Sequence, residues 1–338
     1  MSTTLLRART RIGSEVLGLL GFLLLVVVIF GAFAPRFLSA ANFGSIAFQL
    51  PELGLLTLAM LIPVISGGLN LAIITTANIS GLTLAWVLNA QGGVDAGLGA
   101  FVLGSVLALG VGSLAGCAMG LVIAFTGAHP ILVSLSMMIF LRGLGEFVTR
   151  GGDVSGFPDF VAPIGHGLIL GIPVPLLIFG AAVLAWHTLL SHTRHGFAVY
   201  MIGSNPEAAR YSGINVRRTL VLIYTLSGLM CAIAGILMLS RFNSVRVGHG
   251  ESLLLVTVLA CFLGGVDPFG GFGRVWPVVL ALVVLQVLSS GLNLLGANQH
   301  LSTAIWGLFL LGVMLIRFLA ARWSSRPGRR RSPARPGP

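Results

Sequence analysis

Polar residues that could carry chemistry gather just after Gly67 and Gly68, which interrupt a long apolar run. Helices broken by glycine commonly build translocation sites in membranes, because the freed backbone groups must line a cavity or be buried in protein. Small polar residues also form hydrogen bonds between membrane helices, and that packing role is the alternative. The candidates for a translocation pathway are Gly67, Gly68, Asn70, Thr75, Thr76 and Asn78.

A second polar stretch, residues 192–218, interrupts the apolar runs in the middle of the chain. Ser204 or Asn205 can cap a helix that begins at Pro206, where no N–H is needed. Gly213 can then end that helix in the left-handed conformation. The stretch therefore predicts a surface helix of about two turns that faces water or another protein. Its flanking basic residues are Arg194, Arg210, Arg217 and Arg218.

Catalytic and metal-binding patterns are missing from the sequence. His187, His192 and His195 cluster near the central stretch, but no cysteine or acid stands at ligand spacing, so we interpret them as interfacial polar residues. The chain has no lysine, and therefore no phosphate-binding loop of the Gly-x-x-x-x-Gly-Lys-Ser/Thr type. The sequence predicts neither an enzyme nor a cofactor bound by this chain.

The acids closest to apolar interiors are Glu52 and Glu146. We expect each to lie at the end of a membrane span or to pair with Arg142, rather than to carry protons. A proton-coupled carrier would need an acid well inside the membrane, and neither residue clearly meets that need.

The composition requires a membrane protein. Apolar residues make up 56% of the chain and charged residues 9%, and the mean hydropathy is +1.00. Soluble domains carry roughly 25% charged residues. Several apolar runs exceed the roughly 18 residues that identify a spanning helix. The fold class is therefore all-α and polytopic.

The apolar runs predict about ten spans, some of them broken by glycine. Gly112 and Gly116 in the fourth span have the small-xxx-small spacing that lets membrane helices approach closely. The spans cover about 16–34, 46–66, 71–88, 98–125, 130–148, 172–190, 220–239, 253–265, 275–295 and 301–319.

The net charge of +11 indicates topology rather than nucleic-acid binding, because arginines gather at the ends of spans. The positive-inside rule and the even number of spans place both termini and residues 192–218 in the cytoplasm. We expect a cytoplasmic arm (1–15), one transmembrane domain (16–320) and an Arg/Pro-rich disordered tail (321–338).

The central stretch resembles the cytoplasmic coupling segment of permeases from ATP-binding-cassette (ABC) importers of the ribose/xylose/galactose group, relatives of branched-chain amino-acid permeases. Glycine patterns downstream, at Gly264 and Gly265 and at 270–273 and 291–296, also resemble that family. The similarity covers about residues 42–322. The residues for which the resemblance implies coupling to an ATPase are Gly203, Asn205, Glu207, Ala208, Ala209, Arg210, Gly213 and Ile214.

The chain departs from the family after the second span. The family commonly has an aspartate and a serine where this chain has Asn70 and Ala72. The loss of the carboxylate and the hydroxyl bears on the substrate and on gating.

The resemblance implies a permease subunit that carries a monosaccharide or related polyol. Its partners would be a second permease subunit, identical or homologous, an ATPase subunit that uses ATP and Mg, and an extracytoplasmic substrate-binding protein. The chain would lie in the bacterial cytoplasmic (inner) membrane as a multi-pass protein.

The sequence is also compatible with other functions. The same machinery could carry a nucleoside, a furanone-type signal or an amino acid. An ion-coupled secondary carrier is a different class, and it has no reason to present a docking helix between residues 203 and 214. A membrane enzyme is the weakest alternative, because no acid–base or nucleophile constellation is present.

Overall fold

The computed structural model describes the backbone of residues 2–324. Side chains are described for residues 16–315, except 299, 300, 303 and 314. The side chains of the predicted N-terminal arm lie outside the described residues. The tail was predicted to begin at residue 321, but residues 321–324 continue the last helix; residues 325–338 lie outside the described part.

Helices dominate the described part of the chain, and short strands occur only in its loops. Two 3-10 helices, η1 (Gly93–Asp95) and η2 (Asp159–Val161), lie in connections. The strands β1 (Val154–Ser155) and β4 (Ser244–Val245) pair antiparallel, as do β2 (Leu168–Ile169) and β3 (Ile172–Pro173). The α-helices are α1 (Ser2–Phe33), α2 (Ala40–Ile65), α3 (Ile73–Ala90), α4 (Leu98–Thr126), α5 (Pro130–Thr149), α6 (Ala162–His166), α7 (Val174–His192), α8 (Arg194–Ser204), α9 (Pro206–Tyr211), α10 (Val216–Phe242), α11 (Leu253–Leu263), α12 (Val275–Leu294) and α13 (Gln299–Ser324).

Each predicted span corresponds to a helix. By length and composition, eight helices among the described residues could cross a membrane: α1, α2, α3, α4, α5, α7, α10 and α12. The eighth predicted span, α11, has 11 residues, or about 17 Å at ~1.5 Å per residue, against a hydrocarbon core of about 30 Å. A non-helical segment, residues 246–252, precedes α11.

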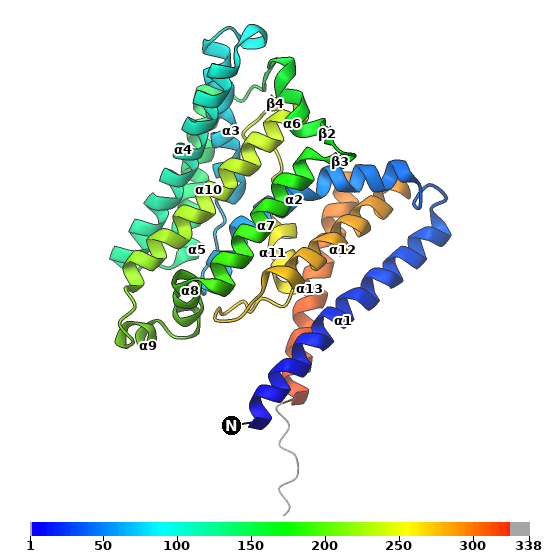
Figure 1. Ribbon diagram of the computed structural model, residues 1–338, viewed down its shortest axis with the longest axis vertical. Helices are drawn as coiled ribbons and strands as arrows, with labels where there is room; N and C mark the ends of the chain where they lie inside the picture. Colours follow the sequence, from blue (N-terminus) through cyan, green and yellow to red (C-terminus); the bar gives the residue numbers. More distant parts are fainter. Residues whose placement is uncertain (1, 325–338) are drawn as a thin grey trace, which may run out of the picture.

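The ends of the molecule separate clearly in Figure 1. The N-terminal end of α1, helices α8 and α9, and the C-terminal end of α13 lie at the lower end of the view. The loops that hold α6, β2, β3 and β4 lie at the upper end. The predicted topology requires this arrangement of the termini and the central stretch; which end faces the cytoplasm stays a prediction.

Helix α10 packs against α4, α3 and α2 through small residues. A Cβ at Gly116 of α4 would overlap the carbonyl oxygen of Tyr224 on α10, and one at Gly112 would lie 2.6 Å from the carbonyl oxygen of Gly228. The predicted close approach at Gly112 and Gly116 is therefore confirmed. Backbones in direct contact give these helices the dispersion energy that membrane helix association depends on.

A buried ion pair joins α2 to the end of α10. Arg241 donates from Nη1 to Oε2 of Glu52 over 2.6 Å, and the side chains are 16% and 8% exposed. Glu52 pairs with Arg241 in the last turn of α10, so the expected pairing with Arg142 was wrong for this residue. Glu146 does pair with Arg142, as expected.

Glu52→Ala is predicted to destabilise the protein strongly, because Arg241 would be left buried without its counter-charge. Removal of one partner of a buried pair costs about 3–5 kcal/mol. Glu146→Ala, which breaks an exposed pair, is the matched control and should cost less than about 1 kcal/mol. Unfolding midpoints in detergent measure both variants, and equal midpoints would contradict the account of Glu52.

Candidate functional site

Both ends of helix α9 are capped by the residues that the sequence predicted. Asn205 caps it, because its Oδ1 accepts hydrogen bonds from the backbone N–H groups of Glu207 and Ala208, each over 3.0 Å. Pro206 takes the first helical position. At the other end, Gly213 has φ +80° and the Ile214 N–H donates to the carbonyl oxygen of Ala209 over 3.1 Å. Of the two residues predicted as possible N-caps, Ser204 and Asn205, the cap is Asn205.

One face of α9 is buried and the rest is free. Ala209 is fully buried and fixes the rotation of the helix, and Ile214 is half-buried. Tyr211 is 89% exposed, although an apolar ring would ordinarily be covered. The other exposed residues of the segment are Asn205, Pro206, Glu207, Ala208, Arg210, Ser212 and Gly213.

Two structural features of this region were not predicted from the sequence. The first is α8, whose start is capped by Thr193 through a hydrogen bond from the Gly196 N–H. Its buried residues Ala198, Val199 and Ile202 have helical spacing, and that signal could have predicted it. The second is the exposure of Tyr211, which no sequence pattern indicates.

The end of α8 meets the ends of two other segments at what we call the glycine junction: Ile65, Gly67, Gly203, Gly270 and Gly271. The Gly271 N–H donates to the carbonyl oxygen of Ile65 over 2.8 Å. A Cβ at Gly203 would overlap both of those backbone groups, and one at Gly270 would lie 2.6 Å from the Gly67 nitrogen. Three backbones therefore touch where any larger residue would separate them.

Tyr200 strengthens this contact from α8. Its hydroxyl donates to the carbonyl oxygen of Gly273 over 2.7 Å. Burial raises the pKa of the Tyr200 phenol, so it stays a neutral donor at physiological pH. The loop after α11 is thus held to α8 by both a side chain and the backbone.

The break after α2 is built around Asn70. The chain turns at Gly67, with φ +85°, and the Gly68 N–H donates back to Pro63 over 2.9 Å. Asn70 is fully buried; its Nδ2 donates to Ser227 Oγ over 2.8 Å, and its Oδ1 accepts from the Ala72 N–H over 3.0 Å. Ser227 in turn donates to the carbonyl oxygen of Ala59 over 2.7 Å. Asn70 therefore ties the broken segment to α10 and α2.

Of the other pathway candidates, Gly67 is exposed, whereas Gly68, Thr75, Thr76 and Asn78 are buried. Thr75 bonds the carbonyl oxygen of Ala72 within its own turn. Asn78 Nδ2 donates to the carbonyl oxygens of Val247 and His249, over 2.5 and 3.0 Å. The hydroxyl of Thr76 is buried without a hydrogen-bond partner among the described residues. This burial favours the packing alternative, and the pathway role of the six candidates stays a prediction.

The glycine junction includes Gly203 at the end of α8, directly before α9, whereas Asn78 bonds the loop that precedes α11. The same cap ends α2 and α11: Gly265 has φ +83°, and the Val266 N–H donates to the carbonyl oxygen of Cys261 over 3.0 Å. The capped ends of α2 and α11 both lie beside the glycine junction. The ends of α2, α11 and α8 therefore form one contact region.

Asn70→Asp is predicted to lower stability by about 1–3 kcal/mol, because a carboxylate cannot donate to Ser227 and leaves a buried group unsatisfied. Thr83→Ala, which removes only a bond to its own helix, is the control. Unfolding midpoints measure both, and an unchanged midpoint for Asn70→Asp would contradict the assigned hydrogen bonds. Uptake by the folded fraction then separates the two roles: a changed rate or substrate range supports the pathway, and an unchanged one leaves packing.

Comparisons with known proteins identify the family. The family described as branched-chain amino acid transport system / permease component matches residues 42–319. The autoinducer 2 import system permease protein LsrD of Yersinia enterocolitica is 31% identical to the chain, over 81% of this chain and 84% of that protein. The ribose import permease protein RbsC of Escherichia coli is 29% identical, over 87% of this chain and 91% of that protein.

The match extends over nearly the whole membrane domain. LsrD of Escherichia coli is 30% identical over 91% of this chain and 93% of its own length. No solved structure matches the chain significantly. The members of the matched family are membrane components of transport systems rather than enzymes. The chain belongs to the family of branched-chain amino acid transport system permease components.

Proposed function

We propose that this permease is the membrane subunit of an ABC importer and carries a neutral monosaccharide or related polyol. It would work in the bacterial cytoplasmic membrane with a second permease subunit. An ATPase subunit using ATP and Mg would dock on α9, and an extracytoplasmic binding protein would deliver the cargo. The similarity to an import permease for ribose supports the cargo class.

The observation that carries the proposal is the exposed α9 on an otherwise membrane-embedded chain. Five of the eight predicted coupling residues are exposed, yet the helix is capped at both ends and anchored by buried Ala209. A preformed, rigid helix loses little conformational entropy when a partner docks. A self-sufficient ion-driven carrier has no use for such a helix.

The glycine junction supports a route by which docking could drive transport. Movement of α8 and α9 would displace the end of α2 and the loop after α11. The backbones touch directly at the glycine junction, so no flexible side chain lies between them to absorb the movement. Interfaces between packed elements of this kind switch between discrete arrangements rather than deforming continuously. ATP binding and hydrolysis in the partner would thereby switch the permease between outward-facing and inward-facing states.

Tyr211→Ala and Gly213→Arg are predicted to reduce recovery of the ATPase at least tenfold in a pull-down from detergent-solubilised membranes. Exposed tyrosines often supply about 2 kcal/mol or more at protein interfaces. An arginine at Gly213 would be strained at φ +80° and would add a charge beside the docking face. Tyr211→Phe, which keeps the ring, is the control and should retain recovery.

Two outcomes would contradict the proposal. One is undiminished ATPase recovery and uptake in Gly213→Arg. The other is uptake by the chain alone that survives ATP depletion and collapses when a protonophore is added, which is the behaviour of a secondary carrier.

A further inference from the structure

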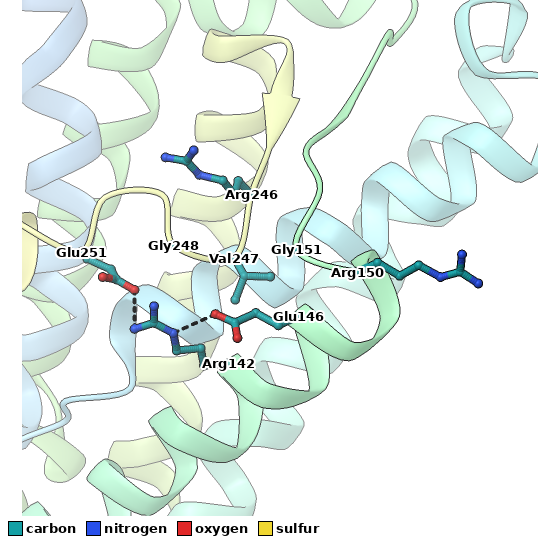
Figure 2. A pocket seen from close by; sticks show the side chains of 8 residues that line it. All are labelled: Arg142, Glu146, Arg150, Gly151, Arg246, Val247, Gly248 and Glu251. Atoms are coloured by element: carbon teal, nitrogen blue, oxygen red, sulfur yellow. Dashed lines mark hydrogen bonds and ion pairs between the residues drawn. The ribbon is translucent and has the colours of Figure 1, made fainter.

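A charged cavity lies beside α5, away from the coupling segment. It has a volume of about 550 Å³, within the range of roughly 300–1,000 Å³ usual for small-molecule sites. Its lining comes from the second half of α5 and from the loop that precedes α11 (Figure 2). The lining residues are Arg142, Glu146, Arg150, Gly151, Arg246, Val247, Gly248 and Glu251.

Three of these side chains meet inside the cavity. Arg142 contacts Glu146 through Nε over 2.9 Å and Glu251 through Nη1 over 2.7 Å. All three side chains are 48% exposed, so the cluster faces open space rather than the protein interior. Figure 2 shows Arg150 and Arg246 pointing away from this cluster, and Arg246 approaches Asp153 over 3.8 Å.

The cluster lies along the C-terminal half of a helix that is long and apolar enough to span a membrane. Helix α5 has 20 residues, about 30 Å, which matches the hydrocarbon core. Arg142 is within about 4 Å of its midpoint, counted along the helix axis. Half-exposed charges at this depth do not face lipid; they face a bundle interior or a water-filled cavity. The charged edge of α5 therefore borders an aqueous space in the assembled protein.

The loop that forms the second wall of the cavity, before α11, is anchored to helix α3. Asn78 on α3 holds the carbonyl oxygens of Val247 and His249, so the backbone that leads to Glu251 is anchored to a neighbouring helix. Side chains held on anchored backbone keep their geometry when a ligand arrives, which lowers the entropy cost of binding. The anchored loop therefore holds Glu251 in place for a solute that enters the cavity.

The hydrogen-bonding groups of the cluster suit a hydroxylated solute. One guanidinium faces two carboxylates, while the other two arginines of the lining, Arg150 and Arg246, point away from them. Carboxylate oxygens accept hydrogen bonds and the guanidinium retains N–H donors beyond the two in use. A hydroxyl both donates and accepts, so adjacent hydroxyls of a sugar or polyol can satisfy both kinds of group at once.

We propose that Arg142, Glu146 and Glu251 form a polyol-contacting station on the translocation pathway. This inference rests on the proposed function and deepens it, because it assigns residues that contact the cargo. The cargo hydroxyls bind in the cavity beside the C-terminal half of α5.

The test uses the assembled importer, with its ATPase and binding protein, in proteoliposomes. Uptake of D-ribose, D-xylose, D-galactose and myo-inositol is measured for the wild type, and the fastest becomes the probe. Glu251→Gln and Glu146→Gln are each expected to lower probe uptake about tenfold or more, the usual effect of losing a hydrogen bond to a charged group. Both should also lose discrimination against the deoxy analogue of the probe. Asp95→Asn, which removes an exposed carboxylate outside the cavity lining, should stay within about twofold.

A labelling experiment reports on the cavity independently of uptake. In a Cys117→Ala background, Glu251→Cys should react with a membrane-impermeant thiosulfonate, and saturating probe sugar should slow the reaction severalfold. Cys231 and Cys261 are buried and stay silent. Leu114→Cys is the control, since Leu114 is an exposed apolar residue near the middle of α4 and should not react.

The outcomes separate the inference from the function it rests on. If the wild type assembles with its ATPase but takes up none of the four compounds, the proposed cargo fails and the station fails with it. If the wild type takes up a sugar and both Glu variants behave like Asp95→Asn, the station is overturned while the importer stands. Labelling without protection by sugar would equally overturn it, because the cavity would then be wet without contacting cargo.

Discussion

The hydrogen bond from the Gly271 N–H to the carbonyl oxygen of Ile65, with Gly203 packed against both groups, joins the parts of this structure that must act together. One partner ends the broken helix α2, one belongs to the loop after α11, and one ends α8. No side chain separates them, so displacement of one segment meets the backbone of the others directly. The exposed α9 is thereby connected to the interior of the membrane domain, which is the connection that a proposed coupling helix needs.

Polar groups of the membrane domain fall into two sets that differ in burial. Asn70, Ser227 and Asn78 are buried and satisfied by neighbouring helices and loops, so they fix the geometry of the broken segments. Arg142, Glu146 and Glu251 are half-exposed and face a cavity. Asn78 links the two sets, because it anchors the loop that carries Glu251. Rigid packing on one side of that loop and an open charged space on the other are what a selective pathway requires.

Much of this architecture could be predicted from local signals. Apolar runs predicted the helices, Pro206 and Gly213 predicted α9, and the spacing of Gly112 and Gly116 predicted close packing on α10. Long-range pairs could not be predicted, because nothing in the sequence near Glu52 indicates Arg241, and nothing near Arg142 indicates Glu251. The burial of Asn70 and the exposure of Tyr211 likewise depend on tertiary packing. Sequence periodicity therefore gave the elements, and packing decided which polar residues face a cavity.

The most direct test of the account is uptake per ATP hydrolysed in Gly203→Ala, measured on purified complex in proteoliposomes. The added methyl would overlap Ile65 and Gly271 and separate the three backbones, whereas Gly180→Ala in α7 meets nothing within 4 Å and is the control. Gly203→Ala is expected to bind its ATPase and to hydrolyse ATP, while uptake per ATP falls about tenfold, equivalent to ~1.4 kcal/mol of lost coupling. Uptake per ATP equal to that of Gly180→Ala, from a correctly assembled complex, would contradict this expectation.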